Sequence, residues 1–169
     1  MMVARNWKTI IFFVCFWTPL TLSAQDNINP MASITDPDDG DVVSSLSSVS
    51  GSSSDNNQVA GVELTITDTV TGDTWNGNEF TSTPTTVTAA AVDGTFDSGD
   101  EAWTYNSPPG AEGAYTVVAT ATDGADNTGS STAVAYTIDA TVPTVSITNP
   151  GDGDVISSLS GISGSSSDN

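Results

Sequence analysis

Residues 143–169 repeat residues 30–56 at a constant offset, and 20 of the 27 paired positions are identical without insertion or deletion. The differences are mild, as where Val49 is matched by Ile162. This repeat period, from Pro30 to Pro143, has the size of one small domain and is too long for a single turn of a solenoid. The repeat therefore predicts a tandem array of domains.

This periodicity sets the expected boundaries. We expect a polar leader over residues 25–29, a complete domain over 30–139, a linker over 140–142 and the N-terminal fragment of a second domain over 143–169. A fragment of this length is below the ~40 residues at which a domain stands alone. We expect it to be mobile, or to pair with an exposed strand edge of the first domain or of another molecule. We also expect the chain to belong to a longer protein.

Residues 1–24 have the features of a secretory signal peptide. Arg5 and Lys8 precede an apolar run over residues 10–22, and Ala24 supplies a small residue for cleavage. The alternative is a membrane anchor, but a spanning helix needs ~20 apolar residues. The sequence thus predicts a secreted, extracellular or cell-surface protein with no membrane span after cleavage.

The charge distribution excludes several functions. Both basic residues lie within the signal segment, so the rest of the chain has no Lys, Arg, His or Cys but all 21 acidic residues. Disulfides are therefore impossible there, and binding to nucleic acid phosphates or to anionic membranes is excluded on electrostatic grounds. Such a chain can attract a divalent cation or a basic partner, although solubility in salt water is a simpler explanation of the charge.

Alternating apolar and polar residues predict an all-β fold without helix beyond a turn. The best example is residues 114–122, where Tyr115, Val117, Ala119 and Ala121 share one face. Residues 51–58 are predicted as a polar loop. Strands are predicted near residues 32–35, 42–50, 62–67, 74–81, 85–92, 103–106 and 114–122, and a last strand ends at residue 138. The first of these strands is repeated at residues 145–148. Seven to nine short strands within one repeat period match an antiparallel β-sandwich.

Several ordered motifs carry a family resemblance. Tyr115 stands two residues before the buried-face Val117, as in the tyrosine corner of immunoglobulin-like sandwiches. The other motifs are Gly61-Val62-Glu63-Leu64, Thr74-Trp75-Asn76-Gly77, Trp103-x-Tyr105 and the run from Ala119 to Thr128. The chain resembles the bacterial immunoglobulin-like repeats of secreted surface proteins and adhesins, arranged as a cadherin-like tandem array. It departs from antibody domains in lacking the cysteine bridge.

The resemblance also suggests calcium sites, because its topology brings particular loops together at each end of a unit. One end would gather Asp26, Asp55, Asp123 and Asp126, and the other Asp36, Asp38, Asp39, Asp41 and Asp139, with Asp168 facing Asp139 across the junction. Carboxylate oxygens are the ligands that Ca²⁺ prefers. The candidate calcium ligands are therefore Asp26, Asp55, Asp123, Asp126, Asp139 and Asp168. The alternative is that these residues only form turns.

The aromatic residues Trp75, Phe80, Trp103 and Tyr105 suggest either a sugar-stacking surface or part of the core. Catalysis is not expected, because no His or Cys is present after the signal segment to serve as base or nucleophile. We expect a non-catalytic spacer, stalk or adhesion module of a bacterial surface protein. Its expected partners are neighbouring repeats and a cell-surface or glycan ligand. The alternative is a carbohydrate-binding accessory module of a secreted enzyme.

Overall fold

The computed structural model describes residues 25–168, so the predicted signal peptide lies outside the described residues. The described chain contains only strands and loops, and it has no helix long and apolar enough to cross a membrane. Its strands are β1 (Met31–Asp36), β2 (Asp41–Val43), β3 (Val49–Ser54), β4 (Val59–Asp68), β5 (Thr74–Trp75), β6 (Phe80–Thr81), β7 (Val87–Thr88), β8 (Ala90–Ala91), β9 (Asp100–Tyr105), β10 (Gly113–Asp123), β11 (Thr128–Ser130), β12 (Val134–Ile138), β13 (Thr144–Asn149) and β14 (Ser163–Ser167).

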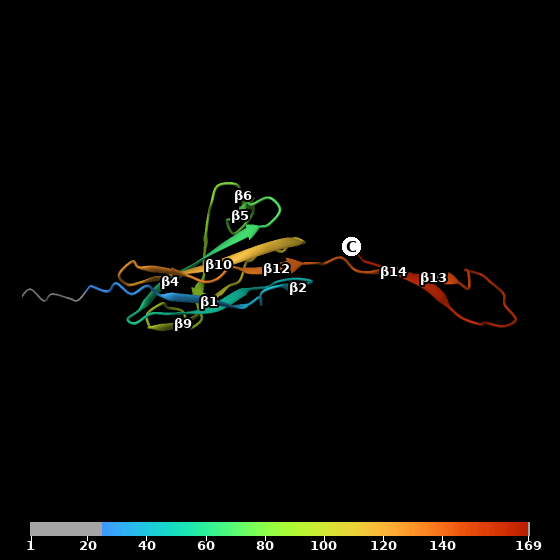
Figure 1. The fold of residues 1–169 in the computed structure, drawn as a ribbon, viewed down its shortest axis with the longest axis horizontal. Coiled ribbons are helices and arrows are strands. Elements are labelled where there is room, and N and C mark those ends of the chain that lie inside the picture. The colour runs from blue at the N-terminus through green and yellow to red at the C-terminus, as the bar shows by residue number, and fades with distance from the viewer. Residues whose placement is uncertain (1–24, 169) are drawn as a thin grey trace, which may run out of the picture.

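The first domain is a β-sandwich of two sheets (Figure 1). One sheet has the order β1-β3-β9-β8, and the other has the order β2-β12-β10-β4-β5-β6, with β11 beside β10 and β7 beside β4. All pairs are antiparallel except β2 with β12, which is parallel. This confirms the predicted all-β, immunoglobulin-like sandwich, while the parallel pair departs from a purely antiparallel one.

The core is formed by the apolar faces of the central strands. In β4 and β10 the alternate residues Val62, Leu64, Ile66, Val117 and Ala119 are all buried. These two strands pair in antiparallel register, with Ile66 opposite Val117 and Leu64 opposite Ala119. Because side chains alternate between the two faces of a strand, this register puts both apolar rows into one layer facing the other sheet. The predicted inward faces of these strands are therefore confirmed.

The predicted strand over residues 42–50 is wrong as a single element. It divides into β2 and the start of β3, which belong to different sheets. The predicted loop over residues 51–58 is also wrong at its start, because Gly51–Ser54 continue β3 between β1 and β9. Small residues suit this central position, since the indole of Trp103 lies directly against the Gly51 backbone.

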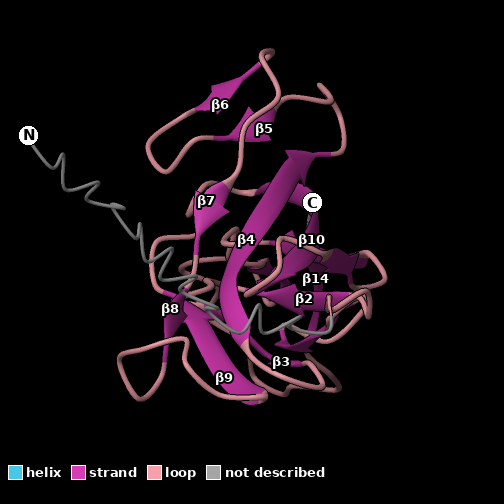
Figure 2. Ribbon diagram, turned by 90° about the vertical axis from the view of Figure 1, so that its left-hand side faces the viewer, coloured by secondary structure: helices cyan, strands magenta, loops and turns pink. Residues whose placement is uncertain are grey.

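The tyrosine corner is confirmed. Tyr115 is buried, and its hydroxyl donates a hydrogen bond to the Ala111 carbonyl oxygen at 2.9 Å. The backbone of Gly113 passes so close that a Cβ there would lie 2.9 Å from this hydroxyl. β5 and β6 form an arm that stands apart from the rest of the sandwich (Figure 2). Phe80 of β6 stacks on the Tyr115 ring at a centroid distance of 5.5 Å, and this contact fastens the β5–β6 arm to the sandwich.

Residues 144–167 form a separate two-stranded sheet, in which β13 pairs with β14 (Figure 1). Every residue of both strands is exposed. Val145, Ile147 and Ile162 are each exposed, so these apolar side chains have no core to pack into among residues 25–168. Among residues 25–168, β13 and β14 pair with each other and with no strand of the first domain. The expected mobility of this segment, and its pairing with another molecule, stay predictions.

Candidate functional site

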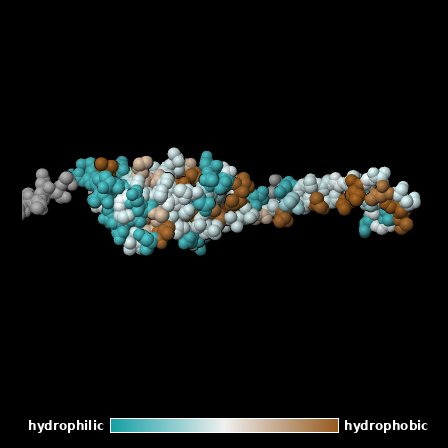
Figure 3. Space-filling model, turned by 90° about the horizontal axis from the view of Figure 1, so that it is seen from below, coloured by the Kyte–Doolittle hydropathy of each residue, from teal (hydrophilic) through white to brown (hydrophobic). Residues whose placement is uncertain are grey.

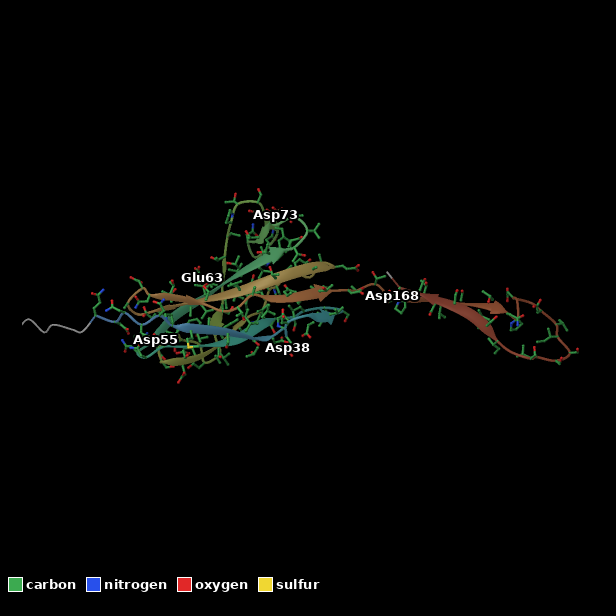
Figure 4. All side chains as sticks on the ribbon, in the orientation of Figure 1. Asp38, Asp55, Glu63, Asp73 and Asp168 are labelled. Carbon is green, nitrogen blue, oxygen red and sulfur yellow. The ribbon has the colours of Figure 1, made fainter. Side chains whose placement is uncertain are left out.

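Three aspartates from distant parts of the chain meet at one end of the sandwich. Asp26 lies in the leader, Asp55 follows β3, and Asp123 ends β10. One carboxylate oxygen from each lies within 4.8 Å of the others. Figure 4 shows Asp55 at the end of the sandwich nearest the leader. Three of the six predicted calcium ligands are therefore brought together.

Asp123 is buried and held by its own turn. Its Oδ1 accepts hydrogen bonds from the backbone N–H groups of Ala125 and Asn127 at 2.8 and 2.7 Å. Its Oδ2 accepts one from Asn127 Nδ2 at 2.7 Å. Burial raises the pKa of Asp123, but the hydrogen bonds from Asn127 and Ala125 outweigh it, and the net pKa is below its usual value. The turn thus keeps Asp123 ionised at neutral pH.

Asp55 uses only one of its two carboxylate oxygens in the fold. Its Oδ2 accepts hydrogen bonds from the backbone N–H groups of Asn57 and Gln58 at 2.8 and 3.2 Å. Its Oδ1 is buried and has no hydrogen-bond partner among the described residues. A buried carboxylate oxygen without a partner is costly unless a donor or a cation satisfies it.

Asp26 connects the leader to this group. Its Oδ2 accepts a hydrogen bond from Asn56 Nδ2 at 3.1 Å, and its Oδ1 accepts one from the Ile28 N–H at 3.1 Å. Asn127 Nδ2, which also binds Asp123, donates to the Asp26 carbonyl oxygen at 3.2 Å. Asn127 therefore joins the leader to the β10–β11 turn. Asn127 was not among the predicted site residues. The sequence feature that could have indicated it is its position four residues after Asp123, in the same turn.

The other predicted ligands are not part of this group. Asp126 lies in the same turn as Asp123 with a positive φ of 66°, but its carboxylate is not among the three. Asp139 follows β12, where its N–H donates to the Val43 carbonyl oxygen at 2.9 Å and its Oδ1 accepts from the Thr141 N–H. Asp168 lies at the linker end of the β13–β14 sheet (Figure 4).

The acidic residues at the opposite end of the sandwich form turns instead of a second carboxylate group, as far as residues 25–168 show. Asp41 Oδ2 accepts a hydrogen bond from the Asp38 N–H at 3.0 Å. Asp39 Oδ1 accepts one from the Ala135 N–H at 2.9 Å, which ties this turn to β12. For Asp39 and Asp41 the turn interpretation describes the geometry, because their carboxylates accept hydrogen bonds from backbone N–H groups.

The candidate sugar-stacking residues belong mainly to the packing of the sandwich. Trp103 is completely buried, so its ring is not available to a ligand. Trp75, Phe80 and Tyr105 are partly buried and pack against the core. Trp75 Nε1 donates to the Tyr105 hydroxyl at 3.3 Å and to the Ser107 carbonyl oxygen at 3.1 Å. These contacts hold the β5–β6 arm against the sandwich.

A buried carboxylate that sequence reasoning missed supports the Asp55 turn. Glu101 Oε1 accepts hydrogen bonds from the Ser98 N–H, the Ser98 hydroxyl and the Asp97 N–H at 2.7, 2.8 and 3.0 Å. The Ser98 hydroxyl bond and the two backbone bonds hold the Glu101 pKa below its usual value against the opposite effect of burial. Glu101 thereby fixes the loop that contains Gly99. The Gly99 carbonyl oxygen accepts a hydrogen bond from the Asp55 N–H at 2.7 Å.

The donor set suits a hard divalent cation. It offers three carboxylates, and no cationic side chain occurs anywhere in residues 25–169 to neutralise them. Ca²⁺ takes six to eight oxygen ligands and accepts flexible geometry, so carboxylate, amide and water oxygens together satisfy it. Residues 25–169 contain no Cys or His, which are the thiolate and imidazole ligands that zinc prefers.

Comparisons with known proteins identify no family. No protein-family model matches the chain, and no curated protein matches it in sequence. Matches are found among solved structures, in 21 chains. One is a structure of the fibronectin(III)-like modules of Clostridium thermocellum CbhA, with a TM-score of 0.39 and 19% sequence identity. The match covers 71% of this chain and 52% of that chain, so this chain spans about half of its length. The assignment of the sandwich fold rests on the strand order and register described above.

Proposed function

We propose that this chain is a non-catalytic extracellular module of a bacterial surface protein, acting as a spacer, stalk or adhesion unit that is stiffened by calcium. The observation that carries the proposal is the meeting of Asp26, Asp55 and Asp123 at the entry to the sandwich. In this role the module does no chemistry. It sets the distance and direction between whatever precedes it and whatever follows it.

Electrostatics supports a bound cation. Three carboxylates within a few ångströms repel each other, and the repulsion grows where burial lowers the local dielectric constant. Asp123 is held ionised by its turn, so protonating it is not an easy way to relieve the repulsion. A calcium ion removes the repulsion and satisfies the buried Asp55 Oδ1.

The chain position of Asp26 gives the ion a mechanical effect. Asp26 belongs to the leader, whereas Asp55 and Asp123 belong to turns of the sandwich. An ion shared among them ties the incoming chain to the domain and removes the freedom of a polar linker. Asp139 and Asp168 stand one repeat period after Asp26 and Asp55, so two of the three ligands recur at the entry to the second unit.

Thermal unfolding with and without calcium tests the proposal. Binding only to the folded state stabilises it by RT ln(1 + [L]/Kd), or ~2.7 kcal/mol at a hundredfold excess over Kd. We therefore expect a higher Tm in millimolar calcium than in chelator. Asp55→Asn should abolish this calcium-dependent rise. In chelator the variant should be at least as stable as the wild type, because it relieves repulsion.

Asp73→Asn is the matched control. It removes the same charge from an exposed turn at the far end of β4, where Asp73 is outside the carboxylate group (Figure 4). It should leave the calcium-dependent rise intact. Identical melting of the wild-type protein in calcium and in chelator would contradict the proposal, and so would equal calcium effects in Asp55→Asn and the wild type.

A further inference from the structure

The chain enters the sandwich at one end and leaves it at the opposite end. The leader precedes β1 at the end where Asp55 lies, and β12 runs into the linker that leads to β13 (Figure 1). Figure 3 shows the same elongated arrangement, with the β13–β14 segment projecting beyond the sandwich. If the module is the spacer or stalk proposed above, on which this inference rests, a pull on its two ends is directed along the strands.

The contact between β2 and β12 lies across this line of pull. β2 is an edge strand, and β12 is its only partner among the described strands. The pair is parallel, with Tyr136 opposite Asp41 and Ile138 opposite Val43. A pull on the leader drags β2 towards the entry end through β1, whereas a pull on the linker drags β12 towards the exit. The two strands are therefore sheared, and the hydrogen bonds between them are loaded together.

This contact must break whichever end of the domain unravels first. From the linker, β12 can leave only by separating from β10 on one side and from β2 on the other. From the leader, β1 must first separate from β3, and β2 must then separate from β12. The β2–β12 contact is therefore the strand pair that both routes have in common.

One bond of this contact is made by a side chain. The Ala135 carbonyl oxygen accepts a hydrogen bond from the Gly40 N–H at 2.8 Å, and the Ala135 N–H donates to Asp39 Oδ1 at 2.9 Å. At the exit end, the Asp139 N–H donates to the Val43 carbonyl oxygen at 2.9 Å. Asp39 thus adds a bond to a carboxylate at the entry end of the ladder, and bonds to ionised acceptors are stronger than neutral ones.

The turn that presents Asp39 is closed by its own bonds. The Asp38 N–H donates to Asp41 Oδ2 at 3.0 Å, and the Asp41 N–H donates to the Asp38 carbonyl oxygen at 3.2 Å. The matching turn of the second unit closes in the same way, through Gly151 and Asp154, although β13 and β14 have no third strand beside them among the described residues. The turn therefore forms without β12, and the Asp39 carboxylate is left to bind β12.

We propose that the bond between Asp39 and Ala135 is a force-bearing link of the β2–β12 contact, and that this contact sets the force at which the first domain unfolds. Forced unfolding is governed by the unfolding rate and not by the equilibrium free energy. Because the bond breaks on the way to the transition state of forced unfolding, it slows unfolding under load more than its place in an exposed turn suggests.

Unfolding at constant force tests this link. The full chain is held by tags at its two ends in magnetic tweezers, in chelator so that the result does not depend on the calcium proposal. Asp39→Ala should unfold about tenfold faster than the wild type at the same force, the rate equivalent of one hydrogen bond to a charged group. Asp39→Asn keeps the acceptor oxygen and should unfold at a rate close to that of the wild type.

Asp68→Ala is the matched control. It removes a carboxylate that accepts the Val70 and Thr71 N–H groups at 2.8 and 3.0 Å in the turn after β4, away from β2 and β12. It should lower the urea midpoint at least as much as Asp39→Ala does, but leave the unfolding rate under force unchanged.

Three outcomes would overturn the proposal. They are no acceleration in Asp39→Ala, equal acceleration in Asp68→Ala, and an Asp39→Asn variant that unfolds as fast as Asp39→Ala. Because Asp39 is outside the group of three carboxylates, any of them leaves the calcium-dependent melting of the proposed function to be decided on its own.

Discussion

The indole ring of Trp103 lies against the backbone of Gly51, on the neighbouring strand of the same sheet. Trp103 is the largest fully buried side chain among the described residues, and the absence of a side chain at Gly51 makes room for it. The Ser33 carbonyl oxygen closes the same space from the other neighbouring strand. The packing at the centre of this sheet therefore depends on the large side chain of Trp103 and on the absence of a side chain at Gly51.

Gly51→Ala should destabilise the first domain strongly. The added methyl group would overlap the Ser33 backbone, which cannot move without disturbing the β1–β3 pairing. Overpacking of this kind typically costs about 1–3 kcal/mol, and a clash with backbone that cannot move lies at the upper end of that range. Gly61→Ala is the control, since no atom lies within 4 Å of a Cβ there. Urea unfolding should show a large loss for the first variant and a change of at most about 0.5 kcal/mol for the second.

Tyr115→Phe should reduce the free energy of unfolding by ~0.5–1.5 kcal/mol, the net value of one hydrogen bond. The phenol that is removed donates to the Ala111 carbonyl oxygen at 2.9 Å. The ring itself, with its contacts to Phe80 and Tyr136, remains in place. An unchanged denaturation midpoint would count against the tyrosine corner as a stabilising contact.

Tyr136→Phe is expected to act in the opposite direction. The Tyr136 hydroxyl is buried and makes no hydrogen bond to any described residue. Removing a buried hydroxyl without a partner relieves its desolvation cost, so the variant should be equal to or more stable than the wild type by up to about 1 kcal/mol. The pair of Tyr-to-Phe variants can be compared by the same urea titration. A loss as large as that of Tyr115→Phe would show that a partner, such as a buried water, serves Tyr136.

Asp39→Ala should cost ~0.5–1 kcal/mol, because Asp39 Oδ1 accepts the Ala135 N–H in an exposed turn. The loss should be the same in calcium and in chelator, since Asp39 is outside the group of three carboxylates. Thermal melts in both conditions measure this. A loss seen only in calcium would instead indicate an ion at this end of the sandwich.

Glu101→Gln should lower the free energy of unfolding at neutral pH. It should also make that free energy less sensitive to acidification. The folded state holds the Glu101 pKa below its ordinary value of 4.5 through hydrogen bonds from Ser98 and Asp97. A lowered folded-state pKa gives stability that is present above pH 4.5 and is lost as the pH falls through the folded-state pKa. The difference between wild type and variant should therefore shrink on acidification below that point. Denaturation midpoints measured across this range check it, and a constant difference would be the contrary result.

The sequence alone determined the repeat, the all-β class and the strands with regular alternation. The inward rows of β4 and β10 followed from a period of two, because that period is a property of the strand itself. The tyrosine corner followed from the spacing of Tyr115 and Val117. The division of residues 42–50 between two sheets did not, because a short Ser-rich run carries no signal for which neighbour it will meet.

The candidate site likewise owes one part to the sequence and another to the tertiary structure. The sequence supplied the acidic turns and their recurrence in the second unit, and the expected topology put Asp26, Asp55 and Asp123 at one end. Only the tertiary structure decided that their oxygens converge, that Asp126 is excluded, and that Glu101 and Asn127 support the group. The physical reason is that convergence depends on how each loop closes its backbone hydrogen bonds. Local turn bonds fix each carboxylate, but the bonds that bring the turns together, such as that from the Asp55 N–H to the Gly99 carbonyl oxygen, join distant residues and leave no periodic trace in the sequence.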